Sequence, residues 1–148
     1  MPTIPIRNKP RTQPEFEHQC ALFTWARNTA TLRKYPALDL LSCSLNGVKL
    51  TAAQAGKAKA AGMLKGEYDV KLPVARGGHI GLIIEMKAGR NTLTPEQEWY
   101  GRRMEEEGWK RETCWTWEQA QRCIVDYLSR PSEPRAAGGA KTEPGAPA

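Results

Sequence analysis

A turn signal between two β-type runs is the feature that most constrains the fold. Residues 68–75 and 80–86 are apolar or alternating, and Arg-Gly-Gly-His at 76–79 separates them. Such a glycine pair between two runs favours a turn, so the sequence predicts an antiparallel hairpin. Residues 80–84, Ile-Gly-Leu-Ile-Ile, are apolar on both faces, which indicates that the second strand is central in a sheet.

Helix signals lie on both sides of this hairpin. A first helix, running to about residue 35, is predicted from a buried face at spacings of three and four: Phe16, Cys20, Phe23, Ala26 and Ala30. Thr-x-x-Gln capping boxes begin further helices at 51–54 and 94–97. Thr116 begins the last helix, whose apolar stripe is Ala120, Cys123, Ile124, Tyr127 and Leu128. Short strands are expected at 38–45 and 109–115.

This order of elements predicts an α/β fold in a single domain, with a central mixed β-sheet that contains the hairpin and is flanked by helices. A chain of 148 residues with 40% hydrophobic residues suits one core. We expect residues 1–14 to form an extended basic arm and residues 15–129 to form the domain. Residues 130–148 are rich in Pro, Gly and Ala without a large apolar residue, so we expect a disordered tail.

Charge and cysteine spacing narrow the classes of function. The net charge of +6 favours an anionic partner. No run of apolar residues is long enough for a membrane span and the start lacks a secretory signal, so we expect a cytoplasmic protein without a membrane partner. The four cysteines form no C-x-x-C pair, which argues against zinc and favours small buried residues.

The hairpin carries the residues that could perform chemistry. Asp69 lies on its first strand, and Glu85-Met86-Lys87 ends the second. Because side chains alternate along a strand, Glu85 and Lys87 project from one face and Met86 from the other. A carboxylate and an ammonium group therefore share a side of the sheet.

The length of the turn decides where Asp69 lies. If Val74 pairs with Ile80 across a five-residue turn, Asp69 is directly opposite the glutamate. A two-residue turn that pairs Arg76 with His79 instead puts Asp69 opposite the methionine, on the wrong face.

Two carboxylates that face each other at neighbouring strand positions repel, which is unfavourable unless a ligand offsets the repulsion. A bound divalent cation would do so. Magnesium prefers oxygen ligands and is usually held by one or two carboxylates, water and substrate phosphate. Lys87 could orient or deprotonate an attacking water, or stabilise charge on a phosphate. These parts predict a metal-assisted phosphodiesterase. The alternative is that Asp69 and Glu85 merely pair with Lys71 and Lys87 at the surface.

Three segments carry a resemblance to a known family. They are Gly-Met-Leu-Lys-Gly-Glu-Tyr-Asp at 62–69, Arg-Gly-Gly-His-Ile-Gly-Leu-Ile-Ile-Glu-Met-Lys at 76–87, and Leu-Thr-Pro-Glu-Gln at 93–97. In this spacing the chain resembles the VRR-NUC branch of the PD-(D/E)XK nuclease superfamily, over roughly residues 15–128. The resemblance implies a core like that of restriction endonucleases.

The resemblance also implies roles for individual residues. Asp69 and Glu85 would be metal ligands, with the Met86 carbonyl as a further ligand, and Lys87 would be the catalytic lysine. Gln97 matches a glutamine of the family that belongs to the site. Its capping box with Thr94 is a competing explanation, and we expect the two roles to coexist only if the side chain turns away from the cap.

An acidic residue of the first helix completes such sites. Glu15, four residues before Gln19, fits this role as catalytic residue and metal ligand better than Glu17. Two positions depart from the family: Tyr68 replaces the usual proline before Asp69, and Leu-Asn-Gly at 45–47 replaces Pro-Asn-Gly. Neither supplies a ligand side chain, so we expect altered loop geometry and at most a weaker or narrower activity.

The expected function is that of an endodeoxyribonuclease dependent on Mg²⁺ or Mn²⁺. Small stand-alone members of the family resemble phage-encoded enzymes that cut branched DNA such as Holliday junctions as homodimers, so the resemblance implies junction DNA and a second copy as partners. Lys49, Lys65 and Arg90 are candidates for contacts with DNA phosphates. The competing expectations are a DNA-binding module of the same fold that cleaves poorly, and a sequence-specific restriction-type enzyme, for which the chain has no room for a recognition domain.

Overall fold

The computed structural model describes residues 14–44 and 49–132. The predicted arm and tail lie outside these residues except for Pro14 and residues 130–132, and so does the Leu-Asn-Gly departure at 45–47. The elements are α1 (Pro14–Ala26), α2 (Thr29–Lys34), the 3-10 helix η1 (Pro36–Leu40), β1 (Ser42–Cys43), α3 (Ala52–Ala60), β2 (Val70–Leu72), β3 (Gly81–Met86), α4 (Pro95–Glu106), β4 (Trp109–Cys114) and α5 (Trp117–Ser129).

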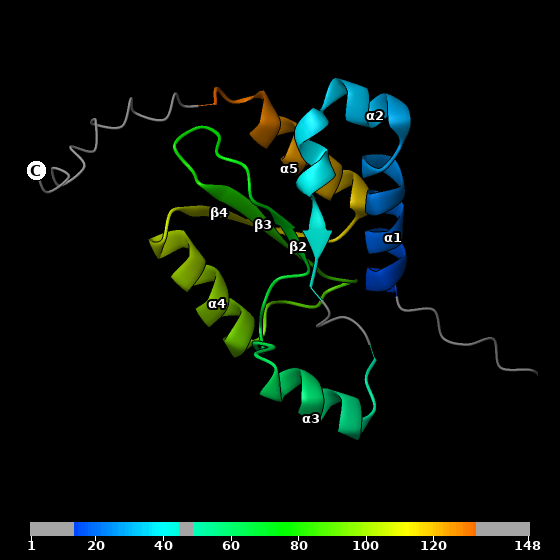
Figure 1. The fold of residues 1–148 in the computed structure, drawn as a ribbon, viewed down its shortest axis with the longest axis vertical. Helices are drawn as coiled ribbons and strands as arrows, with labels where there is room; N and C mark the ends of the chain where they lie inside the picture. The colour runs from blue at the N-terminus through cyan, green and yellow to red at the C-terminus, as the bar shows by residue number, and fades with distance from the viewer. Residues whose placement is uncertain (1–13, 45–48, 133–148) are drawn as a thin grey trace, which may run out of the picture.

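The strands form one mixed sheet in the order β1-β2-β3-β4 (Figure 1). β3 pairs antiparallel with β2 and parallel with β4, and every residue of β3 is buried. The continuous apolar run at 80–84 thus lies in a central strand, as predicted. The α/β fold with a central hairpin-containing sheet is confirmed.

The hairpin combines the tight turn of one alternative with the strand register of the other. Arg76 pairs with His79 across a tight turn, yet the strands pair Val70 with Ile84 and Leu72 with Leu82. One more residue therefore separates Leu72 from Arg76 than separates His79 from Leu82. The chain absorbs this extra residue as an irregularity at residues 73–75, where the Val74 N–H donates to the Leu72 carbonyl at 2.9 Å. The strand register is the one that brings Asp69 opposite Glu85.

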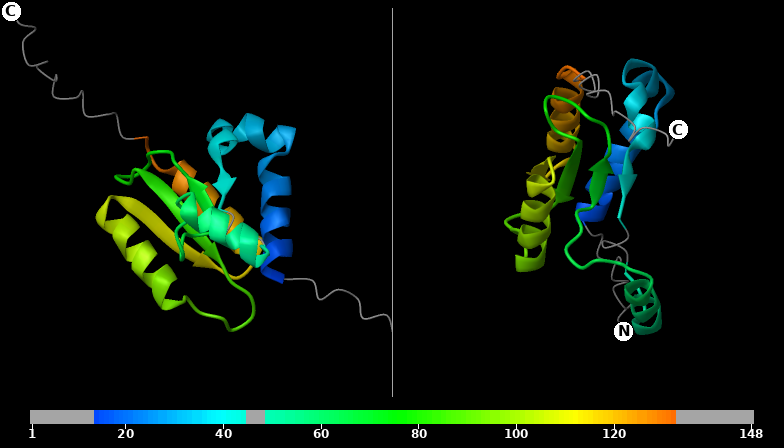
Figure 2. Two further views of the ribbon diagram at one scale, coloured as in Figure 1. Left: turned by 60° about the horizontal axis from the view of Figure 1, so that its bottom comes forward. Right: turned by 60° about the vertical axis from the view of Figure 1, so that its left-hand side comes forward.

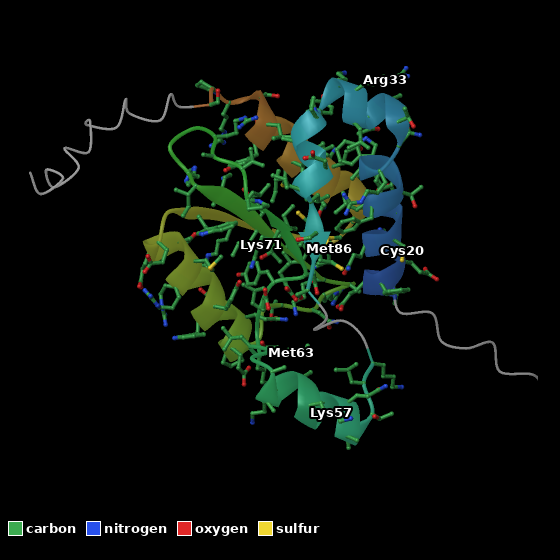
Figure 3. The ribbon with its side chains drawn as sticks, viewed as in Figure 1. Cys20, Arg33, Lys57, Met63, Lys71 and Met86 are labelled. Carbon is green, nitrogen blue, oxygen red and sulfur yellow. The ribbon has the colours of Figure 1, made fainter. Side chains whose placement is uncertain are left out.

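The first helix differs from its prediction. Asn28 accepts a hydrogen bond from the Ala30 N–H and begins α2, so two helices replace one. Phe16 is 52% exposed and Cys20 is also exposed, on α1 (Figure 3). The buried residues of α1 are Leu22 and Ala26. The sequence did not reveal this buried face, because the residue one turn before Leu22 is the polar His18.

The other helices begin where their caps predicted. Complete capping boxes precede α3 and α4, and the Thr116 hydroxyl accepts from the N–H of Gln119 at the start of α5. In α5 the stripe residues Ala120, Ile124 and Tyr127 are buried. None of the helices in the described segments has the length and apolarity needed to cross a bilayer.

Helices cover both faces of the sheet (Figures 1 and 2). On one face, Leu22 of α1 and Ile124 of α5 belong to the main core with Ile84 and Met86. On the other, Tyr100 of α4 packs with Tyr68 and Ile83. The starts of α1, α4 and β2 lie near the end of β3, at one end of the sheet (Figure 1). α3 lies beyond this end and buries none of its residues.

Candidate active site

Asp69 and Glu85 hold each other through reciprocal bonds to the backbone. The Met86 N–H donates to Asp69 Oδ2 at 2.8 Å, and the Asp69 N–H donates to Glu85 Oε2 at 3.2 Å. Each carboxylate thus satisfies an amide at or beside the other's position, one step beyond the last regular strand pair. The bonds fix the two acids next to each other at the end of the hairpin.

Both acids are buried: Asp69 is 9% exposed and Glu85 is 3% exposed. Loss of hydration, followed by the charge of Asp69, raises the pKa of Glu85 to about 8. Burial likewise raises the pKa of Asp69, with a further contribution from the Glu15 charge, although the Met86 amide opposes it. The two carboxylates form a site that resists carrying two negative charges.

These observations exclude the alternative of surface ion pairs. Lys71 pairs with Glu67 at 3.2 Å and not with Asp69. Lys87 does lie beside Glu85, with 3.8 Å between Nζ and Oε1, but its side chain is only 9% exposed. A lysine buried beside two acids is typical of an active site, where buried ionisable groups with shifted pKa values gather.

Gln97 takes part in the site and in its helix cap at the same time. Its Nε2 donates to Glu85 Oε1 at 2.6 Å, while its Oε1 accepts from the Thr94 N–H at 2.9 Å. The expectation that the side chain must leave the cap to reach the site was wrong, because a carboxamide has an acceptor and a donor on separate atoms. The cap fixes the amide so that its donor points at Glu85.

Glu15 lies at the site, whereas Glu17 is exposed. The Ala88 N–H donates to Glu15 Oε1 at 3.1 Å, directly after Lys87 in the chain. This bond ties the start of α1 to the end of β3 and leaves Glu15 close enough to raise the pKa of Asp69.

The three candidate DNA contacts differ in their placement. Lys65 is tied to the start of α4 by an ion pair with Glu96 at 3.2 Å, and its side chain remains 83% exposed. Lys49, before α3, and Arg90, after β3, are exposed. In the part of the chain that the structure describes, neither bonds to a site residue.

Gly66 explains how Lys65 is held beside α4. It has a φ of 92°, and a Cβ on Gly66 would lie 2.5 Å from the backbone carbon and oxygen of Glu96. Only glycine permits this approach of the two backbones. The segment between α3 and β2 is therefore seated on the first turn of α4.

Tyr68, the residue in place of the usual proline, belongs to the core. It is 1% exposed, and its ring lies 5.7 Å from that of Tyr100. Its hydroxyl lies next to Gly101, where a Cβ would meet it at 2.2 Å. The tyrosine thus anchors the segment that leads into Asp69 against α4.

The donor set suits a hard divalent cation. Two buried carboxylates with raised pKa values gain from a neighbouring positive charge, and magnesium or manganese prefers such oxygen ligands. Among residues 14–44 and 49–132, no three His, Cys, Asp or Glu side chains are grouped to hold a metal ion. The acids available are therefore the Asp69–Glu85 pair, with Glu15 acting on Asp69 through space.

Comparison with solved structures identifies the fold. A structure described as "VRR_NUC domain protein" superposes with a TM-score of 0.66 and 24% identity, over 82% of this chain and 93% of that chain. The chain has the VRR_NUC fold. No protein-family model and no curated protein matches it. The VRR_NUC fold confirms the fold expected from the three segments at 62–69, 76–87 and 93–97.

Sequence reasoning missed the backbone donors of this site. The N–H groups of Asp69, Met86 and Ala88 hold the three acids, and backbone groups leave no mark in a sequence. It also missed His18, whose Nδ1 accepts from the Trp117 N–H at 3.1 Å and so joins α1 to α5. The available signal was the position of His18 one helical turn before the apolar Leu22.

Proposed function

We propose that the protein is an endodeoxyribonuclease that uses Mg²⁺ or Mn²⁺ to hydrolyse phosphodiester bonds. The observation that carries the proposal is the buried Asp69–Glu85 pair with Lys87 beside it. The name of the VRR_NUC domain protein supports the same reading. Lys87 supplies one positive charge to the two buried acids, and a bound cation would supply the positive charge that the pair still lacks.

Asp69 and Glu85 would hold the metal ion through their carboxylates, with the Met86 carbonyl and water as further ligands. Glu15 lies outside this pair in the structure, so it would add its negative charge beside the ion and would become a ligand through Oε2 only if its side chain turned towards Asp69, since its Oε1 accepts the Ala88 amide. When bound, the ion would polarise the phosphate and lower the pKa of a coordinated water.

The remaining groups act on water and phosphate directly. Lys87 Nζ, 3.8 Å from Glu85 Oε1, supplies a positive charge where an attacking water and a phosphate oxygen would meet. Gln97 keeps Glu85 oriented through its 2.6 Å bond. Water itself is the nucleophile, so no residue of the protein forms a covalent intermediate.

DNA would approach the end of the sheet where the acids lie. Lys65, held at the start of α4, together with the exposed Lys49 and Arg90, would contact phosphates. Such contacts are independent of sequence, which agrees with recognition of DNA shape. We extend the proposal to branched DNA such as Holliday junctions and to a homodimer, whose two-fold axis would present two sites to two strands.

Cleavage assays with defined DNA test the proposal. Single-stranded, duplex, flap and four-way substrates are incubated with Mg²⁺, Mn²⁺ or chelator, and sedimentation gives the oligomeric state. We expect metal-dependent cutting that is strongest on the four-way substrate. Asp69→Asn should abolish cutting without weakening DNA binding, because removing a negative charge cannot reduce attraction to phosphate.

Lys87→Met should slow cutting by roughly 100-fold or more at saturating metal, in the range of a lost acid–base or charge-stabilising group. Lys71→Met is the matched control, since this lysine of the same hairpin pairs with Glu67. Equal cutting by the wild type, the Asp69 variant and the Lys87 variant would contradict the assigned site. Binding without cleavage in any metal would favour the non-catalytic DNA-binding module.

A further inference from the structure

The expectation of four small buried cysteines was wrong, because Cys20 and Cys43 are exposed, and the other two cysteines contact each other. Cys114 Sγ and Cys123 Sγ lie 3.7 Å apart. Cys114 is 1% exposed at the end of β4, whereas Cys123 on α5 is half-buried. Cys20 and Cys43 are exposed, because they lie on the outer side of α1 and on the edge strand β1.

The segment between the two cysteines is held in place. Gln119 Oε1 accepts from the Trp115 N–H at 2.8 Å, and the Gln119 N–H donates to the Thr116 hydroxyl at 3.2 Å. Cys114 is fixed on its other side, where its carbonyl accepts the Lys87 N–H at 2.9 Å. The two sulfurs thus meet because β4 and α5 are fixed, and not through a mobile loop.

We propose that Cys114 and Cys123 are a redox-active dithiol that a peroxide or a glutathione disulfide converts into an intramolecular disulfide. The sulfurs need to approach by roughly 1.7 Å, from 3.7 Å to the length of an S–S bond. Rotation of the two side chains supplies this movement, while the backbone between them stays in place. The proposal does not depend on nuclease activity.

The environments of the two thiols assign their roles. Cys114 is 1% exposed, whereas Cys123 is the thiol that solvent reaches, so Cys123 reacts first. With hydrogen peroxide, its sulfur takes one oxygen to give a sulfenic acid and releases water. Cys114 then attacks that sulfur, the S–S bond forms, and a second water leaves. With glutathione disulfide, Cys123 attacks one sulfur and releases one glutathione, and Cys114 then attacks Cys123 in the mixed disulfide and releases the second glutathione.

The link would fasten α5 to the strand end that holds the Lys87 amide. It closes a short loop that is already folded, so it restricts the unfolded chain more than the folded one. The oxidised protein should therefore resist unfolding better than the reduced protein.

A variant with Cys20→Ser and Cys43→Ser leaves only the pair for the test. After treatment with hydrogen peroxide or glutathione disulfide, we expect the denatured protein to lose both titratable thiols. Its mass should fall by two hydrogens without dimer formation, and dithiothreitol should restore both thiols. The urea midpoint of the oxidised form should be higher than that of the reduced form.

Adding Cys123→Ser provides the second variant. Cys114 should then remain titratable after the same treatment, and the urea midpoint should not rise, because the buried thiol has no partner. Persistence of both thiols in the first variant would overturn the proposal. So would thiol loss through oxygen addition or through links between two chains. An oxidised form with an unchanged or lower urea midpoint would show that the disulfide strains the folded protein, and would overturn the proposal that the two sulfurs are in position to join without movement of the backbone.

Discussion

Replacing Glu85 by glutamine should remove the loss of stability with rising pH that Glu85 causes in the wild type. Glu85 has an ordinary pKa of 4.5 in the unfolded chain and about 8 in the folded protein. Between these values the folded state binds more protons than the unfolded state, so the free energy of unfolding falls as pH rises. The stability tied to this proton is complete below about pH 4.5 and lost above about pH 8. Glutamine has the same shape and no proton to lose.

The magnitude follows from the two pKa values. Moving one proton from a pKa of 4.5 to about 8 corresponds to roughly 5 kcal/mol. Asp69 shares the same proton, so the measurable difference is on the order of 3–5 kcal/mol. Without metal, the unfolding free energy of Glu85→Gln minus that of the wild type should rise by this amount from about pH 4.5 to about pH 9.

Urea denaturation in chelator across this pH range measures the difference. Glu17→Gln is the control, because Glu17 is an exposed acid of α1. Excess Mg²⁺ at the high end should raise the stability of the wild type more than that of Glu85→Gln, since the ion binds the charged pair. If the difference in unfolding free energy between the two proteins stays constant with pH, the reasoning is refuted, because Glu85 would then have the same pKa in the folded and unfolded states.

Three further substitutions have matched controls or conservative forms. Gln97→Ala and Gln54→Ala each lose one capping box, at about 1 kcal/mol in urea denaturation, but only the first should also slow DNA cleavage. Gly66→Ala should cost about 1–3 kcal/mol more than Gly62→Ala, since both have positive φ but only the first meets backbone atoms; thermal unfolding compares them. Glu15→Gln keeps the acceptor for its amide, so calorimetry should show weaker Mg²⁺ binding with stability changed by less than about 1 kcal/mol.

Much of the fold could be predicted from local signals in the sequence. The Thr51, Thr94 and Thr116 caps each begin a helix, because a side-chain acceptor for free amides acts within one turn. The central position of β3 followed from its apolar run. The break at Asn28 was missed, since the apolar spacing continues past it and the cap depends on one side chain.

The site was harder to predict, because it depends on contacts between segments that are distant in the chain. Alternation along β3 placed Glu85 and Lys87 on one face, but the position of Asp69 depended on a turn that the sequence left open. From the sequence, Gln97 was expected to act either in the helix cap or in the site. The sequence does not reveal that its Oε1 accepts from the cap while its Nε2 donates to Glu85. The approach of Glu15 to Ala88, across most of the domain, has no local signal.

The extra residue on the first side of the hairpin allows the turn to change in length or sequence. Because the irregularity at residues 73–75 separates the tight turn from the regular strand pairs, such a change need not move Asp69 and Glu85 at the other end of the hairpin. A deletion of one residue there would be absorbed by straightening the strand. The same deletion after Leu82 has no such reserve and would carry Glu85 to the opposite side of the sheet.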